Sequence, residues 1–449
     1  MWATRAQQFE DGRERRALIS RAGHGEWVPA EDRPDPIDVL IASNDGRLDE
    51  LIPIRFGRMA ASPFAFLRGS AAVMAADLSR VPTTGLEVQV SGDCHLLNFG
   101  LFATPERNVS FGLNDFDETM RGPWEWDVKR LVASLVVASQ DAGFDDSTAE
   151  SVAVTGAQAY RRRVAELASM SPLEVYYDRF DLAELIEESP DKAARKHREK
   201  MLRKAHRRVA ENLYPRLAEP AAGGLRIADQ PPLIFHMDDV TPETVQGFFD
   251  NYRSSLREDL QVLFDRYVLR DVAVKVVGVG SVGTRCYAAL FTDDNGGPLL
   301  LQVKEANKSV LAAYVPTRSK KRVHNGERVV TGQHLMQAVS DIFLGHSTSP
   351  AGRDFYVRQL RDMKLSVTAW ETEPGLMARY ARFCGMALAR AHANTGSASA
   401  ITGYLGDSDT ADKSFAQFGL AYAEQTIRDH QALVEAIDKE RVAARLDTP

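Results

Sequence analysis

Two short polar clusters lie close to segments that alternate apolar and polar residues. The first is the loop 91–98, Ser-Gly-Asp-Cys-His-Leu-Leu-Asn, in which Asp93 and Asn98 are five residues apart. The second is 113–117, Leu-Asn-Asp-Phe-Asp, which places Asp115 at the end of the next alternating segment. Carboxylate and amide oxygens are the ligands that Mg²⁺ prefers, and a carboxylate left off the metal can accept a proton from a hydroxyl. The residue types of the two clusters predict a magnesium site at Asn98 and Asp115, with Asp93 as the base. The alternative is that all three residues only cap turns.

A glycine-rich run lies between two further predicted strands: Gly278-Val279-Gly280-Ser281-Val282-Gly283. A dinucleotide-binding unit would place such a run between a strand and a helix. The context of strand, turn and strand instead favours a flap whose backbone N–H groups cover phosphates. We therefore expect Gly278, Gly280, Ser281 and Gly283 to bind a nucleotide.

A lysine ends the apolar run 300–304, about twenty residues after the glycine-rich run. A buried ammonium is costly unless it meets an anion, so Lys304 is a candidate for phosphate binding. The alternative is a lysine that reaches solvent along the strand. Glu327, near the start of the following predicted helix, is a candidate carboxylate partner for Lys304, or else a solvated acidic residue in a first helical turn.

The elements that must position these residues follow from the spacing of apolar side chains. Alternation predicts strands near 86–90 and 109–113, which we expect to pair as a hairpin that brings Asp115 beside Asp93. Helical spacing predicts helices over 72–79 and 127–138. Four β-rich runs and one intervening helix follow later in the chain: 272–277, 285–291, 299–304, a helix over 326–343, and 355–360.

This change of pattern predicts an α+β protein of two lobes. Residues 1–50 form a poorly defined segment, because Pro29, Pro34 and Pro36 are expected to break any helix. The predicted parts that follow are a helical lobe with the catalytic and metal loops at 51–269, a small β-rich nucleotide-binding lobe at 270–363, and C-terminal helices at 364–449 that complete the large lobe.

Composition is that of a globular protein. The 449 residues carry a formal net charge of −7 and 44% hydrophobic residues, which excludes disordered and fibrous classes. The mild acidity argues against nucleic acid as a partner. The first thirty residues lack the apolar core of a signal peptide, and the longest apolar run, 131–139, has about half the length of a membrane helix. With three widely separated cysteines, these features predict a cytoplasmic protein without membrane contact.

The three motifs together resemble those of protein-kinase-like phosphotransferases, in particular the aminoglycoside and choline kinase branch. Lys304 corresponds to the strand lysine of that superfamily, Asp93 and Asn98 to its catalytic loop, and Asp115 to its metal-binding aspartate. The resemblance implies a bilobal kinase-like fold, with ATP and Mg²⁺ as cofactors. It also implies that Asp127, after the run Gly122-Pro123-Trp124-Glu125-Trp126, is buried and supports the catalytic loop.

The chain departs from that superfamily in three ways. The catalytic and metal loops precede the glycine-rich loop, which implies a circularly permuted fold. Ser91 stands where a histidine is usual, and no arginine precedes Asp93, which points towards small-molecule acceptors. Asp117 stands where a glycine is usual.

The chain is also similar, over nearly its whole length, to a bacterial family catalogued as domain-of-unknown-function family 2252. The similarity rests on these segments: 62–69 (Ser-Pro-Phe-Ala-Phe-Leu-Arg-Gly), 92–100, 114–119, 276–283 and 387–393 (Ala-Leu-Ala-Arg-Ala-His-Ala). That resemblance implies no established activity.

Several charged residues allow two interpretations. Arg55, Arg58 and Arg68 flank an apolar segment and are either phosphate ligands or arginines in structural salt bridges. The basic segment Lys192–Arg208 is either a solvated helix face or a surface for an anionic ligand. His95 would be a metal ligand only in a two-metal site, for which clustered histidine partners are missing from the sequence.

The sequence therefore predicts an ATP- and Mg²⁺-dependent phosphotransferase that acts on a hydroxyl of a small-molecule acceptor. Two alternatives remain. The same residues could transfer AMP with the nucleotide turned around, or the chain could be a nucleotide-binding pseudokinase without turnover.

Overall fold

The computed structural model describes most of the chain: residues 3–183, 217–221, 224–237, 242–276, 278, 280–316, 323–360 and 373–446, with isolated residues between 192 and 203. Most of the predicted basic helix within 192–208 lies outside the described residues. The protein is a mixture of helix and sheet, 52% helical and 16% strand, which confirms the α+β class.

The helices fall into an N-terminal group, a middle group and a C-terminal group. The N-terminal helices are α1 (Arg5–Glu14), α2 (Pro36–Ala42), α3 (Ile52–Met59), α4 (Pro63–Gly69) and α5 (Ala71–Leu78). The middle helices are α6 (Trp124–Asp141), α7 (Asp146–Ser169), α8 (Pro172–Tyr177), α12 (Pro242–Ser255), α13 (Glu258–Phe264) and α14 (Asn325–Met336). The C-terminal helices are α15 (Pro374–Ala393), α16 (Ala398–Leu405) and α17 (Thr410–Asp438). Short 3₁₀ turns include η2 (Ala22–Gly25), η4 (Leu96–Asn98) and η5 (Val310–Ala313).

The largest sheet has six antiparallel strands in the order β12-β13-β11-β10-β9-β8. Its strands are β8 (Ile234–Phe235), β9 (Val268–Lys275), β10 (Cys286–Thr292), β11 (Pro298–Glu305), β12 (Gly345–Thr348) and β13 (Asp354–Gln359). Three smaller sheets contain β1 (Glu87–Val90) with β4 (Met120–Pro123), β2 (Phe99–Ala103) with β3 (Val109–Leu113) and β5 (Phe180–Asp181), and β6 (Ala218–Ala221) with β7 (Gly224–Ile227).

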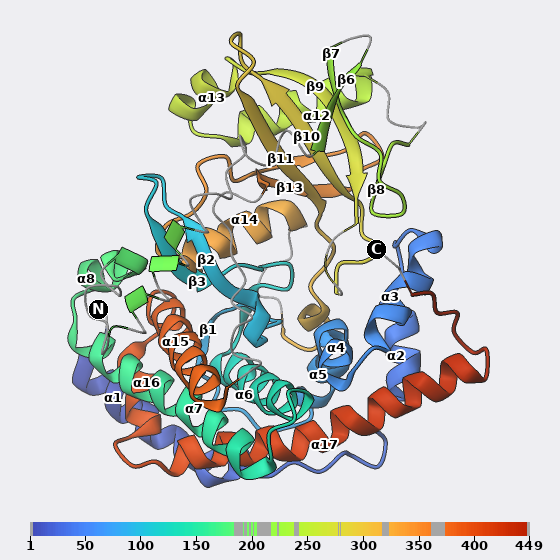
Figure 1. The fold of residues 1–449 in the computed structure, drawn as a ribbon. Helices are drawn as coiled ribbons and strands as arrows, with labels where there is room; N and C mark the ends of the chain where they lie inside the picture. Colours follow the sequence, from blue (N-terminus) through green and yellow to red (C-terminus); the bar gives the residue numbers. More distant parts are fainter. Residues whose placement is uncertain are drawn as a thin grey trace.

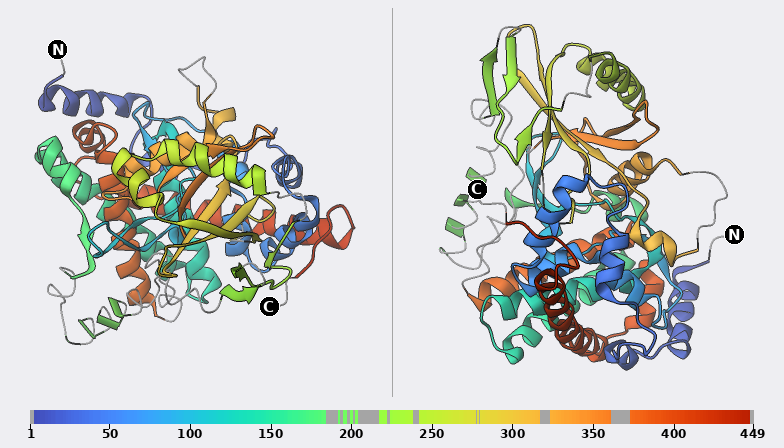
Figure 2. Two further views of the ribbon diagram at one scale, coloured as in Figure 1. Left: turned by 90° about the horizontal axis from the view of Figure 1, so that it is seen from above. Right: turned by 90° about the vertical axis from the view of Figure 1, so that its right-hand side faces the viewer.

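The six-stranded sheet and the main group of helices lie at opposite ends of the molecule (Figures 1 and 2). Helices α12 and α13 cover one face of the sheet, with Phe249, Tyr252, Phe264 and Phe291 packed edge to face or tilted between them. These two helices precede residue 270, which is where the sequence analysis starts the β-rich lobe. Elements that pack on the sheet therefore begin before that boundary. Helix α14 and strands β1 to β3 lie between the sheet and the helices (Figure 1).

Helix α6 forms the centre of the helical end. Sixteen of its 18 residues are buried, because α4, α7, α15 and α17 all contact it. A helix surrounded in this way is apolar on most of its faces. Four charged residues of its first turns are therefore buried: Glu125, Asp127 and Arg130, which have hydrogen-bond partners, and Lys129, whose ammonium lies 4.5 Å from the centre of the Phe418 ring.

The N-terminal segment is folded, so the expectation of a poorly defined stretch before residue 50 is wrong. Thr4 and Gln7 form a capping box at the start of α1. Asp35 caps α2, and Pro36 occupies its first turn, where a proline favours a helix instead of breaking it. Arg33 forms salt bridges with Asp77 at 2.7 Å and with Asp429 at 2.6 Å, which tie the segment to α5 and α17.

His24 of the same segment makes stability depend on pH. It is fully buried, its Nε2 lies 2.7 Å from the Tyr404 hydroxyl, and burial, helped by the Lys129 charge, lowers its pKa to about 3. Between pH 6.5 and 3 the unfolded chain therefore binds a proton that the folded chain does not, so stability falls as the pH falls, by about 1.4 kcal/mol per unit. In His24→Phe, chemical denaturation at pH 7 and pH 5 should show a smaller pH-dependent loss than in the wild type. Equal losses in both proteins would contradict this assignment.

One expectation about strand pairing and one about a helix need correction. The strand near 86–90 does not pair with that near 109–113: β1 pairs with β4, and β3 pairs with β2. Asn98 directly precedes β2 and Asn114 directly follows β3, and the Asn114 N–H donates to the Asn98 carbonyl at 2.8 Å. The β2–β3 hairpin therefore brings the two polar clusters together. The helix predicted over 326–343 ends at Met336, and the short strand β12 follows.

Candidate functional site

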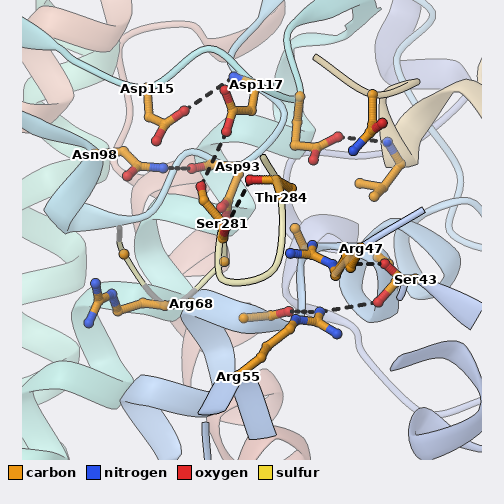
Figure 3. A pocket seen from close by; sticks show the side chains of 18 of the residues that line it. Ser43, Arg47, Arg55, Arg68, Asp93, Asn98, Asp115, Asp117, Ser281 and Thr284 are labelled. Atoms are coloured by element: carbon orange, nitrogen blue, oxygen red, sulfur yellow. Dashed lines mark hydrogen bonds between the residues drawn. The ribbon is translucent and has the colours of Figure 1, made fainter. Parts of the chain in front are cut away.

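A cavity of about 460 Å³ lies where the glycine-rich loop faces the ends of the β2–β3 hairpin (Figure 3). Segments far apart in the sequence line it: Ser43, Arg47, Arg55, Arg68, Asp93, Asn98, Asp115, Asp117, Gly278, Gly280, Ser281 and Thr284, among others. Six of the sequence-predicted site residues thus meet at one site, namely Asp93, Asn98, Asp115, Gly278, Gly280 and Ser281, whereas Gly283, Lys304 and Glu327 are not part of its lining. Cavities of this volume are large enough for a small-molecule ligand.

Asp93 is bound on one side and accessible on the other. Its Oδ1 accepts two hydrogen bonds from the buried Arg130, from Nε at 3.0 Å and from Nη2 at 2.7 Å. Its Oδ2 lies 3.8 Å from His95 Nε2, and the side chain is 20% exposed. Burial lowers the pKa of His95 to about 4, so this imidazole is neutral near pH 7 and leaves the carboxylate charge in place. Asp93 is therefore oriented by Arg130 and presents an oxygen to the cavity.

Asn98 is oriented by the same loop. Its Nδ2 donates to the backbone carbonyl of Asp93 at 2.6 Å, at the end of the 3₁₀ turn η4. This bond assigns the amide nitrogen to the protein and makes the amide oxygen the atom that a ligand can reach. Asp115, on the next loop, lies beside Asn98 in Figure 3, and its side chain is 32% exposed.

Asp127 holds the loop of Asp93 in place, as the sequence analysis predicts. Its carboxylate accepts hydrogen bonds from the backbone N–H groups of Ser91 at 2.7 Å and Gly92 at 3.0 Å, and it lies 3.2 Å from Nε2 of the buried His392. Gly92 has a φ of +82°, and a Cβ there would lie 2.4 Å from the Glu118 carbonyl, so only glycine fits. The loop geometry is thus determined by buried contacts.

Lys304 meets two carboxylates, although neither is the expected one. Its side chain is 2% exposed, and its Nζ is bonded to Asp117 and lies 4.0 Å from Asp115. Burial disfavours the ammonium charge, but these two carboxylates outweigh that effect and raise the lysine pKa. The Tyr356 hydroxyl donates to the other oxygen of Asp117 at 2.9 Å.

The expected pair of Lys304 with Glu327 is wrong. Glu327 is exposed in the first turn of α14, where its backbone N–H donates to the His324 cap. The residue of α14 that reaches the metal loop is Arg328, which donates to the carbonyls of Thr119 at 2.6 Å and Asp117 at 2.8 Å. Sequence reasoning does not predict Asp117 as the partner of Lys304. The signal for it is the sequence Asp115-Phe116-Asp117, which places a second carboxylate two residues after the predicted metal ligand.

The glycine-rich loop joins β9 to β10 and rests on the N-terminal helices. The Gly283 carbonyl accepts from the Leu48 N–H at 2.8 Å, and the Gly278 carbonyl accepts from Arg58 Nη1 at 3.0 Å. Ser281 Oγ donates to Asp117 Oδ2 at 3.4 Å, and both residues line the cavity. Val277 and Val279 of this loop lie outside the described residues.

The oxygen donors fit a hard cation that keeps part of its water shell. In the described part of the chain, no group of three or more His, Cys, Asp and Glu side chains is arranged to hold a metal ion. Asn98 and Asp115 supply one amide and one carboxylate. Mg²⁺ is commonly held by one or two carboxylates together with substrate phosphates and water, so this pair fits Mg²⁺ bound with a nucleotide.

Comparison with known proteins gives one match. The model of a family described as "Uncharacterized protein conserved in bacteria (DUF2252)" matches residues 47–436. No curated protein and no solved structure matches the chain. Among the described helices, none has both the length and the apolar composition that crossing a bilayer requires.

Proposed function

The chain belongs to this bacterial family, and we propose that it is an ATP- and Mg²⁺-dependent phosphotransferase that acts on a hydroxyl group of a small-molecule acceptor. The observation that carries the proposal is the cavity that joins Asp93, Asn98 and Asp115 to the glycine-rich loop, with the buried Lys304 bonded to the lining residue Asp117. Phosphoryl transfer needs mainly positioning and neutralisation of charge, and these groups supply both.

Each group has one task in the proposed reaction. The backbone N–H groups of the glycine-rich loop bind the nucleotide phosphates, and Lys304 neutralises the α- and β-phosphates. Asn98 and Asp115 hold Mg²⁺, which supplies further positive charge at the phosphates. Asp93 orients the acceptor hydroxyl and takes its proton, because its Oδ1 is fixed by Arg130 while the side chain reaches the cavity.

The proposal includes a protein-kinase-like fold of two lobes in permuted order. It is supported by the order of strand β9, glycine-rich loop, β10, Lys304 on β11 and helix α14, which is the order of motifs in that superfamily. It is also supported by the buried Asp127 beneath the loop of Asp93. The catalytic loop precedes these elements instead of following them, which a permutation accounts for.

Binding of MgATP to this site should depend on Lys304 and Asp115. Titration calorimetry of Lys304→Ala and Asp115→Ala should give at least about tenfold weaker binding than the wild type, because each loses a charge-assisted contact to the phosphates or the ion. Omission of Mg²⁺ should weaken wild-type binding in the same way. Lys308→Ala is the matched control, since Lys308 is an exposed lysine of the same cavity wall. Lack of binding at millimolar ATP would end the kinase-like proposal.

Two alternatives are each favoured by one observation. The Arg130 bond to Asp93 would suit a nucleotide-binding protein without turnover, and in that case Asp93→Asn would leave its function intact. The arginines at the other side of the cavity would suit a nucleotide turned around, with AMP as the transferred group. Mass spectrometry of the products separates the two transfers, because a phosphoryl and an adenylyl group differ in mass.

A further inference from the structure

Three arginines line the side of the cavity opposite the acidic residues. Figure 3 shows Arg47, Arg55 and Arg68 on one side and Asp93 and Asp115 on the other. In the described residues, none of the three arginines forms an ion pair with a carboxylate, which sets them apart from structural salt bridges. We call these three residues the arginine face.

Arg68, at the end of α4, is the least satisfied of them. It makes no hydrogen bond to the residues that the structure describes, its Nε is buried without a partner, and its guanidinium lies 5.9 Å from the centre of the Phe64 ring. The carboxylate of Asp93 favours the charged form of Arg68, but it already accepts two hydrogen bonds from Arg130. Arg68 therefore lines the cavity without a hydrogen bond or an ion pair to the described residues.

Arg55 and Arg47 are bonded to neutral groups alone. Arg55 is 2% exposed and donates to the Ser43 hydroxyl at 3.1 Å and the Gly69 carbonyl at 3.0 Å, while its Nε has no partner. Arg47 donates to the carbonyls of Val282 and Ser43. These contacts hold the two side chains rigid without cancelling their charge.

An anion in the cavity would remove this electrostatic cost. Burial lowers the pKa of all three arginines, and it outweighs the carboxylates that act on two of them, Asp93 on Arg68 and Glu118, Asp117 and Glu305 on Arg47. A guanidinium has a planar set of donors that matches phosphate oxygens and remains charged. A dianionic phosphate group fits a face with several guanidinium groups better than a single carboxylate does.

We infer that the arginine face binds a phosphate group of the acceptor, so that the acceptor is a phosphorylated small molecule with a free hydroxyl at Asp93. The inference rests on the proposed phosphotransferase function. In the reaction, Asp93 takes the hydroxyl proton and the acceptor oxygen bonds to the γ-phosphorus of ATP. The bond from that phosphorus to the β–γ bridging oxygen breaks, which leaves ADP and a product with two phosphate groups.

Inorganic phosphate is the probe for the arginine face, and its binding is measured by calorimetry on the full chain without nucleotide. Arg68→Gln should weaken phosphate binding at least about tenfold, because a charge-assisted contact is lost. Arg68→Lys should weaken it less. Arg163→Gln should leave it unchanged, since that arginine lies on α7 and pairs with Asp178 and Glu166 outside the cavity. Arg47→Gln provides a second test if Arg68→Gln does not fold.

Repeating the titration with saturating MgATP identifies the source of the phosphate. Phosphate that still binds supports an acceptor subsite. Phosphate that is displaced, together with weaker MgATP binding by Arg68→Gln, would show that the arginine face holds the nucleotide and would overturn the inference. MgATP binding without any phosphate binding also overturns it and leaves the proposed function standing. Phosphate binding without MgATP binding would instead refute the phosphotransferase and leave only an anion site.

Discussion

Asp93→Asn is expected to lower the rate of phosphoryl transfer by about 10²- to 10⁴-fold, the usual contribution of a general base. The geometry should persist, because the asparagine oxygen can still accept the Arg130 bonds at 2.7 and 3.0 Å. The change removes the carboxylate charge and with it the ability to take the hydroxyl proton. Mg²⁺-dependent release of ADP measures the rate, and calorimetry should show that MgATP binding is retained.

Asp45→Asn is the control for this experiment. Asp45 is an exposed carboxylate at the rim of the same cavity, so its replacement removes the same charge without touching the proposed base. The control should transfer at close to the wild-type rate. An Asp93→Asn protein that binds and transfers like the wild type would refute the role of Asp93 and favour nucleotide binding without turnover.

Asp127→Ala is expected to cost about 3–5 kcal/mol in the free energy of unfolding, as removal of one member of a buried charged network does. The substitution leaves the N–H groups of Ser91 and Gly92 without acceptors. It also removes a polar partner of the buried His392 and leaves a cavity beside it. Thermal and urea denaturation measure the loss. Because these N–H groups belong to the loop of Asp93, transfer should also fall well below the level that the folded fraction explains.

Glu125→Ala separates the two effects. Glu125 lies in the same first turn of α6, is equally buried, and accepts from the Thr84 N–H at 2.6 Å, away from the catalytic loop. The Glu125→Ala substitution should also destabilise the protein, yet the molecules that remain folded should transfer the phosphoryl group at close to the wild-type rate. If the two variants lose activity in equal proportion to their stability, Asp127 has only a structural role.

The strands and the three motifs could be predicted because they are local. The β-rich runs 272–277, 285–291, 299–304 and 355–360 correspond to β9, β10, β11 and β13, and the Asp93–Asn98 spacing marks a loop that lines the cavity. The pairing of strands is not local. Strand β1 pairs with β4, whose sequence Met-Arg-Gly-Pro does not alternate apolar and polar residues, so this pairing depends on packing that alternation does not encode.

The same limit explains the errors at the site. Sequence separation favours the pair of Lys304 and Glu327, but the Lys304 ammonium is bonded to Asp117, which lies nearly two hundred residues earlier in the chain. The missing carboxylate partner of Arg68 could not be recognised from sequence either, since an absence of partners becomes visible only once the neighbours are known.

The contacts between the glycine-rich loop and the N-terminal helices have a thermodynamic consequence. Because Leu48 and Arg58 bond to the carbonyls of Gly283 and Gly278, lifting the loop breaks bonds that also hold the segment 47–58. The two movements are therefore linked equilibria. A ligand that fixes the loop must stabilise the segment, and whatever loosens the segment must weaken that ligand by the same free energy.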